Sequence, residues 1–336
     1  MPAASCIVTV SRPVLRPIFE AMEARLAASG FRVVSYATIE AFRSDPAALA
    51  ETDVLLAAGD TPCTRGIMQA APRLRGVISP FIGTEGFDEA AATDLGILVA
   101  NGQTPENAES MAEATILLML AALYDLNHSQ AVLRGSVPRP PHSRAFMARG
   151  RTIGLIGYGN IAKAMTARLT GWGMGFLAWS RTPDPNAPVR WVELDQLLRD
   201  SDVVCVLLGL NAGTRGLLTA DRLRQMKPNA LLINTARGGI IDEDALVALA
   251  RERPEMRIAL DTFATEPLPA DSALRDLPNA ILTPHMVGHT VESHAVLPGV
   301  AVDAVNALLM GEPPLYVRNP AVIPAWRRRW SRPETP

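Results

Sequence analysis

Residues Thr152–Arg181 read TIGLIGYGNIAKAMTARLTGWGMGFLAWSR, and this stretch decides the fold of the chain. Thr152–Ile156 is a short apolar run typical of a buried parallel strand. Gly157 permits a tight turn after it, and Gly159 lets the backbone approach a pyrophosphate at the start of the following helix. Ala162 is small enough for that helix to pack closely on the strand. Because a second apolar strand follows at the expected distance, the stretch predicts one half of a dinucleotide-binding unit.

Length and composition indicate a globular protein with room for two domains. The chain has 336 residues, of which 48% are hydrophobic and 20% are charged, and its formal net charge is −2. This balance gives no sign of a nucleic-acid partner or of an anionic membrane surface. A basic cluster near the C-terminus is the exception, and we expect it to be a solvated tail. Its members are Arg327, Arg328, Arg329 and Arg332.

The cysteines and the N-terminal sequence indicate in which cellular compartment the protein is located. Cys6, Cys63 and Cys205 are too widely spaced for a disulfide framework or a metal site. No basic, apolar and small-residue signal opens the chain, and the longest apolar run, Ile116–Tyr124, is too short to span a bilayer. We therefore expect a protein of the cytoplasm, which is a reducing compartment.

The first hundred residues alternate between strand-like and helix-like runs. The strand-like runs are short and apolar, and lie at Cys6–Val10, Val33–Tyr36, Val54–Ala58, Val77–Ile78 and Ile97–Ala100. Helical spacing of apolar residues occupies Val14–Ser29, Thr64–Ala71 and Phe87–Asp94. Alternation of this kind predicts an open parallel sheet with helices on both faces.

A second series of alternating elements begins at Thr152. After the glycine turn, further strands are expected at Val203–Leu208, Ala230–Asn234, Ile258–Leu260 and Ala280–Pro284. Helices are expected near Val192–Asp200, Ala220–Gln225 and Glu243–Arg251, with a final helix at Val291–Met310. The two series share no visible sequence repeat. They predict two α/β domains.

A long helical stretch joins the two series. It runs from Pro105 to about Leu126 and carries apolar residues around most of its circumference. A helix of this kind must be buried by more than one neighbour, so we expect it between domains or between the subunits of a homodimer. Gly135–Arg149 is rich in Pro, Ser and Arg and predicts a surface loop or linker.

Five further blocks accompany the glycine turn in a fixed order. They are LRGVISPFIGTEGFDEAAATDLGILVANG (Leu74–Gly102), ENAESMAEATILLML (Glu106–Leu120), MKPNALLINTARGGIIDEDAL (Met226–Leu246), ALDTFATEPLP (Ala259–Pro269) and NAILTPHMVGHT (Asn279–Thr290). From about Arg75 onward, the chain thereby resembles the D-isomer-specific 2-hydroxyacid dehydrogenases, which include phosphoglycerate dehydrogenases and glyoxylate or hydroxypyruvate reductases. Five ordered blocks are far more specific than any one motif.

The resemblance implies an α/β fold in which a Rossmann coenzyme domain is inserted into a flavodoxin-like substrate domain. The substrate domain would comprise residues 1–101 and 291–336, and the NAD(P)-binding domain residues 102–290. The last helix would then return to the first domain. This agrees with the two alternating series and the linker found from the residues themselves.

Arg237 follows the predicted strand Ala230–Asn234 in the string NTARGG. Ligands of open parallel sheets sit beyond the carboxyl ends of the strands, and a guanidinium can bind a carboxylate through two parallel hydrogen bonds. On the residues alone, an ordinary surface arginine is the alternative. The resemblance implies that Arg237 binds the substrate carboxylate and polarises its keto group.

Glu266 and His285 each follow a predicted strand end. Reduction of a 2-keto acid needs a proton donor at the developing alkoxide, and an imidazolium suits neutral pH. A nearby carboxylate favours the protonated imidazole. A structural histidine is the alternative. The resemblance implies that His285 is the general acid/base and Glu266 its orienting partner.

The spacing of His285 and His289, with His294 beyond them, raises a metal site as another interpretation. Pro284 and Gly288 argue against the helix that such a site needs, and no acidic or cysteine ligand lies close in sequence. We therefore expect no metal. His289 departs from the aromatic or small residue of many relatives, which makes it a candidate substrate contact.

A turn in the first domain is expected to bind the substrate carboxylate. It runs Phe81-Ile82-Gly83-Thr84, and its glycine permits close approach of the main chain to an anion. A plain strand-to-helix turn is the alternative. The resemblance favours the N–H groups of Ile82 and Gly83 as donors.

The choice of nicotinamide cofactor depends on Ser180. Relatives that prefer NAD place an aspartate at the end of this strand, where it binds the ribose 2′-hydroxyl, whereas this chain has Ser180 and Arg181. A 2′-phosphate is then not repelled and can pair with Arg181, which favours NADP(H). An NAD(H) enzyme that tolerates serine is the alternative. Besides Gly157 and Gly159 of the turn, the resemblance carries over further cofactor contacts: Asn160 and Ile161 at the helix start, the main chain of Thr235 and Ala236, Asp261 to the carboxamide, and Gly288.

Together with these residues, the resemblance implies a NAD(P)-dependent oxidoreductase that interconverts a small 2-keto acid and its D-2-hydroxy acid, with glyoxylate and hydroxypyruvate as candidate substrates. We expect two domains to close over the reactants and exclude water. A dehydrogenase of another small anion on the same scaffold is one alternative, although the Glu266–His285 pair argues against formate. A cofactor-sensing protein like the corepressors that share this fold is another alternative. Such corepressors carry extra recognition segments, whereas the two domains account for nearly all of this chain.

Overall fold

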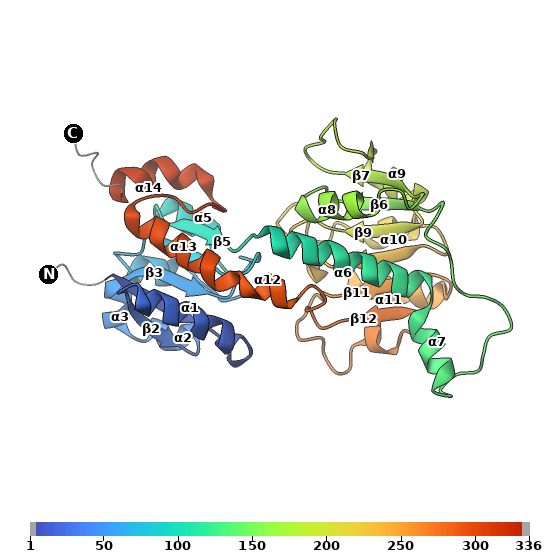
Figure 1. Cartoon of the computed structure of the whole chain (residues 1–336), viewed down its shortest axis with the longest axis horizontal. Coiled ribbons are helices and arrows are strands. Elements are labelled where there is room, and N and C mark those ends of the chain that lie inside the picture. Colours follow the sequence, from blue (N-terminus) through green and yellow to red (C-terminus); the bar gives the residue numbers. More distant parts are fainter. Residues whose placement is uncertain (1–4, 331–336) are drawn as a thin grey trace. The chain divides into compact units, whose positions relative to one another are not determined.

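The computed structural model describes residues 5–330, which fall into two compact α/β units (Figure 1). Within the described residues, the smaller unit comprises residues 5–104 and 290–330, and the larger comprises Pro105–His289. The breaks therefore lie at 104/105 and 289/290, against 101/102 and 290/291 expected from the sequence. Each unit has its own hydrophobic core and parallel sheet.

The smaller unit contains a five-stranded parallel sheet with the order β2-β1-β3-β4-β5. This is the flavodoxin-like order. Its strands are β1 (Cys6–Val10), β2 (Arg32–Tyr36), β3 (Thr52–Ala57), β4 (Gly76–Ser79) and β5 (Leu98–Asn101). The central strands β1, β3 and β4 are wholly buried, as their apolar sequences predict.

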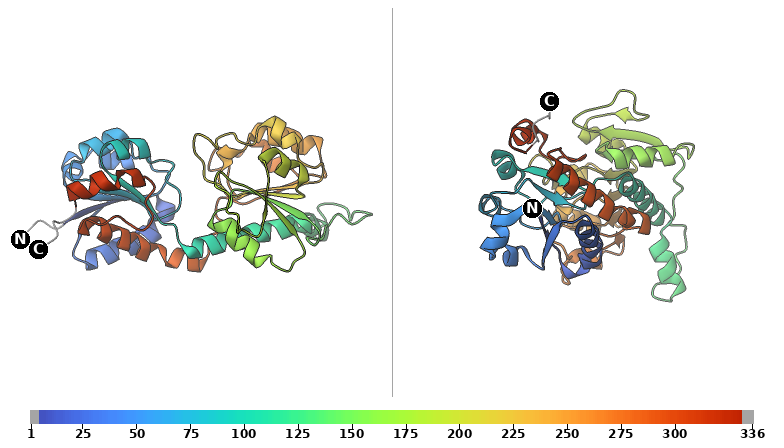
Figure 2. Two further views of the ribbon diagram at one scale, coloured as in Figure 1. Left: turned by 90° about the horizontal axis from the view of Figure 1, so that it is seen from above. Right: turned by 60° about the vertical axis from the view of Figure 1, so that its left-hand side comes forward.

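Helices cover both faces of this sheet (Figure 2). One face carries α1 (Arg16–Ala28), α13 (Leu297–Met310) and α14 (Ile323–Trp330), and the other carries α2 (Ile39–Arg43), α3 (Pro46–Glu51), α4 (Arg65–Ala70) and α5 (Glu89–Asp94). The short helices α2 and α3 were not predicted. Thr38 and Asp45 cap them through side-chain hydrogen bonds, which compensates for their length.

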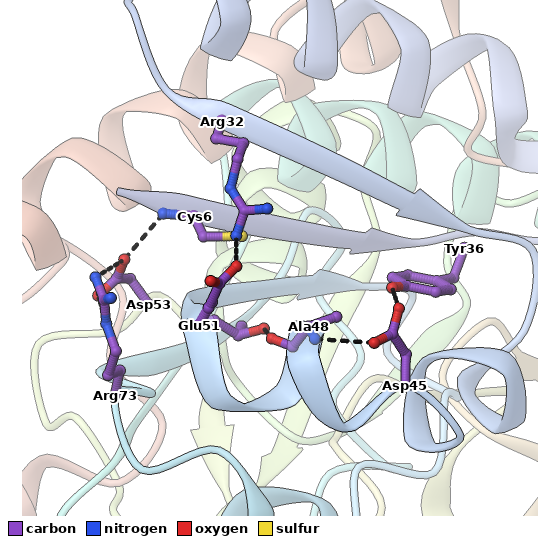
Figure 3. Close-up of polar contacts among 9 residues, drawn as sticks. Cys6, Arg32, Tyr36, Asp45, Ala48, Glu51, Asp53 and Arg73 are labelled. Carbon is purple, nitrogen blue, oxygen red and sulfur yellow. Dashed lines mark hydrogen bonds and ion pairs between the residues drawn. The ribbon is translucent and has the colours of Figure 1, made fainter. Parts of the chain in front are cut away.

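Buried polar contacts fix the starts of β1 and β3 (Figure 3). Asp53 is 2% exposed and accepts hydrogen bonds from the backbone N–H of Cys6 at 2.9 Å and from the Arg73 guanidinium at 3.0 Å. At the end of β2, the Tyr36 hydroxyl donates to Asp45 at 2.7 Å. Burial together with this carboxylate raises the pKa of Tyr36 to about 12. These contacts hold the sheet to its flanking segments.

The expected final helix is interrupted and is followed by a further one. The stretch Val291–Met310 divides into α12 (Val291–Ala295) and α13. By length and composition alone this stretch could cross a membrane, contrary to the expectation from the longest apolar run. Its α13 part packs on α1, β3 and β4, with Val305 and Leu308 fully buried. The apolar surface of α13 is thus core surface of a sheet-and-helix unit.

The basic cluster is exposed, as expected, because Arg327, Arg328 and Arg329 all lie at the surface, but these residues belong to a helix rather than to an unstructured tail. Residues Ile323–Trp330 form α14, whose Trp326 is fully buried and donates from Nε1 to the carbonyl of Arg75 at 2.7 Å. The Arg75 guanidinium lies 4.8 Å from the centroid of the Trp330 ring. Arg332 lies outside the described residues. The tryptophans, rather than the arginines between them, determine where this segment lies.

The larger unit contains a seven-stranded parallel sheet with the order β12-β11-β10-β9-β6-β7-β8. Starting from β8, this is the Rossmann order with one strand added. Its strands are β6 (Thr152–Ile156), β7 (Gly175–Trp179), β8 (Arg190–Trp191), β9 (Val203–Val206), β10 (Leu231–Asn234), β11 (Arg257–Leu260) and β12 (Ala280–Leu282). The central strand β6 is the strand predicted to precede the glycine turn, and it has the predicted bounds.

Helices again cover both faces (Figure 2). One face carries α6 (Pro105–Leu123) and α8 (Asn160–Arg168), and the other carries α9 (Leu194–Asp200), α10 (Ala220–Arg224) and α11 (Glu243–Glu252). After α6, Asp125 adopts a left-handed conformation and α7 (Leu126–Leu133) follows, which the sequence did not predict. Gly135–Arg149 forms a loop, as predicted.

The long helix α6 finds its neighbours inside the larger unit. It packs on α8, β10 and β11, so that Met119 is fully buried. The expected burial by more than one neighbour is confirmed, whereas the expected place of this helix between domains or between subunits stays a prediction. Leu117 of this helix and Tyr124, which follows it, remain 58% and 53% exposed.

Candidate active site

The glycine turn has the backbone geometry that a dinucleotide needs. Gly157 has a φ of +98°, and a Cβ there would lie 2.8 Å from the carbonyl oxygen of Leu207, so this position requires glycine. Gly159 is the N-cap of α8, with no side-chain cap and no atom within 4 Å of where its Cβ would be. The first N–H groups of α8, at Asn160 and Ile161, are thus left for an anion. These residues fit a nucleotide pyrophosphate.

The end of β7 carries no carboxylate. Trp179 is its last residue, and Ser180 and Arg181 follow. The Ser180 hydroxyl accepts a long hydrogen bond, 3.4 Å, from the N–H of Thr182. Arg181 is exposed and has no ion-pair partner among residues 5–330. A hydroxyl and an uncompensated guanidinium therefore stand where a ribose-binding aspartate would.

Glu266 and His285 are brought together as predicted. The His285 Nδ1 donates to Glu266 Oε2 at 2.6 Å, and the two side chains are 40% and 34% exposed. The Glu266 segment follows β11, and His285 follows β12, the strand paired with β11. With Nδ1 held by the carboxylate, the Nε2 atom of the imidazole remains for proton transfer.

The surroundings keep Glu266 ionised. Burial alone would raise the pKa of Glu266, but hydrogen bonds from His285 and from the N–H of Phe263, at 3.0 Å, outweigh it. The positive charges of His285 and Arg237 act in the same direction, so the pKa lies below its usual value. Arg237 is therefore one of the charges that lower the pKa of Glu266.

Arg237 lies three residues beyond the end of β10, at the carboxyl edge of the sheet. The buried Asn234 accepts from the N–H of Ala236 at 3.0 Å and donates to the carbonyl of Arg237 at 3.0 Å. This bridge fixes the backbone from which the guanidinium extends. The side chain is partly exposed, and its Nη1 donates to the carbonyl of Ala236 at 2.7 Å. The sequence located this arginine but not the asparagine that orients its loop.

Asp261 has an internal function that the sequence did not reveal. It is 2% exposed, and its Oδ1 accepts from the Thr283 hydroxyl at 2.7 Å and from the N–H groups of Met286 and Val287 at 3.0 and 3.2 Å. Burial raises its pKa, against the effect of these donors. This carboxylate fixes the turn in which His285 has a φ of +55°. That conformation is uncommon for a residue other than glycine and is held by the surrounding bonds.

Three other predicted cofactor residues also make contacts within the unit. The main-chain N–H and carbonyl of Ala236 are both engaged by neighbours, and the Thr235 hydroxyl lies 3.1 Å from that of Thr115. The carbonyl of Gly288 accepts from the Ser110 hydroxyl at 2.7 Å, and a Cβ at Gly288 would lie 2.0 Å from Met111 Sδ. Thr235 and Gly288 thus contact α6. Within residues 5–330, no three His, Cys, Asp or Glu side chains gather as a metal site would require.

In the smaller unit, the Ile82–Gly83 turn offers main-chain donors. Its conformation is fixed by Asn101, which donates to the carbonyl of Ile82 at 2.7 Å. Gly59 packs against it so closely that a Cβ there would lie 1.8 Å from the carbonyl oxygen of Gly83. Within the described chain, neither the N–H of Ile82 nor that of Gly83 donates a hydrogen bond. Both are left for an anionic ligand.

Comparison with known proteins identifies the family. The profile described as "D-isomer specific 2-hydroxyacid dehydrogenase, NAD binding domain" matches residues 116–287. The chain is 33% identical over 294 residues to glyoxylate/hydroxypyruvate reductase B of Pectobacterium carotovorum, covering 85% of this chain and 91% of that protein. It is also 33% identical over 274 residues to D-3-phosphoglycerate dehydrogenase of Mycobacterium leprae, but spans only 51% of that protein's length and 79% of its own.

A solved structure agrees over nearly the whole chain. The NADPH-dependent glyoxylate/hydroxypyruvate reductase of Sinorhizobium meliloti, in complex with NADP and malonate, superposes with a TM-score of 0.84 at 27% identity. The match covers 99% of this chain and 100% of that one. This likeness agrees with the fold class that the sequence blocks predict. The chain belongs to the D-isomer-specific 2-hydroxyacid dehydrogenases, a family of nicotinamide-dependent oxidoreductases.

Proposed function

We propose that the protein reduces small 2-keto acids to D-2-hydroxy acids at the expense of a nicotinamide cofactor, with His285 as the proton donor. The observation that carries this proposal is the 2.6 Å contact between His285 and Glu266, at the edge of the sheet that also bears Arg237 and the glycine turn. Relatives named glyoxylate reductase and glyoxylate/hydroxypyruvate reductase support the substrate class.

The side chains divide the chemistry between them. The bound nicotinamide supplies the hydride for the carbonyl carbon. Arg237 binds the substrate carboxylate and stabilises the charge that develops on the carbonyl oxygen. We assign the N–H groups of Ile82 and Gly83 to the same carboxylate. His285 donates its Nε2 proton to that oxygen, while Glu266 stabilises the imidazolium and fixes the ring through Nδ1.

A panel of keto acids tests the proposal. We expect the purified protein to oxidise NADPH, measured by loss of its absorbance, on addition of glyoxylate, hydroxypyruvate or pyruvate. The product should be the D-2-hydroxy acid, identified by chiral chromatography. Tight cofactor binding with no turnover on any keto acid would favour a cofactor sensor instead. Turnover of formate or phosphite alone would assign the same scaffold to another anion.

We further propose that NADP(H) is preferred. Ser180 has no negative charge to repel a 2′-phosphate, and the Arg181 guanidinium can pair with it. Ser180→Asp is expected to lower the ratio of kcat/KM for NADPH to that for NADH by roughly tenfold to a hundredfold, since a carboxylate there repels the phosphate and binds the ribose hydroxyls. Ser136→Asp makes the same chemical change on an exposed loop and should leave the ratio unaltered. An unchanged ratio in Ser180→Asp would show that residue 180 does not contact the 2′ position of the ribose.

A further inference from the structure

Glu243 is a half-buried carboxylate next to the candidate active site. It is the first residue of α11, but the capping of that helix is performed by Asp242, whose side chain accepts from the N–H of Ala245 at 3.0 Å. The carboxylate of Glu243 is therefore not needed to satisfy its own helix. The neighbouring Asp244, in the same turn, is exposed to solvent.

The Glu243 side chain instead bonds to the segment that carries Glu266. Its Oε1 accepts a hydrogen bond from the backbone N–H of Ala264. The preceding N–H, that of Phe263, donates to Glu266 Oε1 at 3.0 Å. Two carboxylates thus hold two consecutive peptide groups of one loop, and one of these carboxylates is the partner of His285.

The Arg237 loop packs against the same peptide groups. A Cβ at Gly238 would lie 1.9 Å from the carbonyl carbon of Phe263 and 2.3 Å from the nitrogen of Ala264. Because these are backbone atoms, no side-chain movement could relieve the overlap. The chain between Arg237 and Glu243 therefore touches the Glu266 loop at both of its ends, once through glycine packing and once through the Glu243 carboxylate.

The electrostatic surroundings of Glu243 couple it to the site. Burial raises the pKa of Glu243 above its usual value, and the N–H of Ala264 opposes this effect. The charges of Asp244 and of Glu266 raise the pKa further, so Glu243 and Glu266 lie within electrostatic reach of each other. A negative charge in this position adds to that of Glu266 in favouring a positive charge nearby.

We propose that Glu243 is a positioning residue: through the Ala264 peptide it holds Glu266 in place against His285, and its negative charge favours the protonated imidazole. The kinetic part of this inference rests on the proposed function, whereas the structural part does not. No contact between Glu243 and substrate or cofactor is required.

Three variants separate the anchoring contact from the charge. Glu243→Ala removes both, Glu243→Gln keeps an acceptor oxygen and removes the charge, and Asp244→Asn removes a charge from the same helical turn without touching the loop. We expect Glu243→Ala to lower kcat for keto-acid reduction by roughly tenfold to a hundredfold, because small displacements of reacting groups are costly. Its dissociation constant for NADPH, measured by fluorescence, should stay within about twofold of wild type.

The glutamine variant tests the charge. Glu243→Gln should keep most of the wild-type kcat at acidic pH, because its side-chain oxygen can still accept from Ala264. Its reductive activity should fall at a lower pH than that of wild type, by about half a pH unit, since loss of a negative charge disfavours the imidazolium. Asp244→Asn should match wild type in both kcat and pH profile.

Hydrogen exchange supplies a readout that needs no turnover. The amides of residues 262–266 should exchange faster in Glu243→Ala than in wild type or Asp244→Asn, because one of their hydrogen bonds is lost. If wild type turns over no keto acid, the proposed function fails while this result still decides whether Glu243 holds the loop. Unchanged exchange, or unchanged kcat and pH profile in both Glu243 variants, would overturn the inference. Parallel losses of kcat, cofactor binding and melting temperature in both variants would overturn it too, since they would indicate a merely structural residue.

Discussion

Arg237→Ala is expected to lower kcat/KM for reduction of a 2-keto acid by about a thousandfold or more. The guanidinium has two functions in the proposed mechanism, because it binds the substrate carboxylate and stabilises the developing oxyanion. Loss of one preorganised oxyanion donor typically costs roughly a hundredfold to a thousandfold in kcat, and loss of a charged carboxylate anchor adds to this. Steady-state kinetics with saturating NADPH measures the effect.

Two further variants sharpen this test. Arg237→Lys keeps the charge but not the planar fork of donors, so it should recover only part of the lost rate. Arg224→Ala removes an exposed arginine that pairs with Glu252 at 3.1 Å on the helical face, and should behave as wild type. Near-normal kcat/KM in Arg237→Ala would refute the assignment of this residue, whatever the behaviour of His285.

The local patterns of the sequence predicted the scaffold well. β1 and β6 have the predicted bounds, because short, uniformly apolar runs between turn residues admit few other conformations in an alternating chain. The family resemblance paired Glu266 with His285, and the position of each after a predicted strand of one parallel sheet agreed with that pairing. Prediction succeeded where a feature depended on neighbours in sequence or on the sheet as a whole.

What the sequence did not reveal depends on particular contacts between distant residues. The carboxylate of Asp261 holds the turn containing His285 only because β11 and β12 pair in one register. Glu243 reaches Ala264 only once α11 lies beside the segment after β11. Neither side chain carries a spacing signal, since an acid after a strand or at a helix start is ordinary. The contacts of such residues can be identified only from the three-dimensional structure.

Trp326→Ala is expected to destabilise the smaller unit by about 3–5 kcal/mol. The indole of Trp326 is fully buried between α14 and the helix-covered sheet, so its removal leaves a large cavity. Its Nε1 also donates to the carbonyl of Arg75 at 2.7 Å, and loss of that donor leaves the carbonyl without this partner. Arg75 in turn donates to the carbonyl of Leu309 at 3.1 Å, so the same contact joins α14 to the end of α13.

Calorimetry can assign this effect to one unit. Because the glycine turn lies in the larger unit, NADPH should raise the melting temperature of that unit and leave the other transition in place. Trp326→Ala should lower the NADPH-insensitive transition by about 10 °C. Trp326→Phe, which fills most of the space without the donor, should lower it less, and the exposed Arg328→Ala should leave it nearly unchanged. A Trp326→Ala protein that melts like wild type would contradict this prediction. It would mean that burial of the Trp326 side chain adds nothing to the stability of the smaller unit.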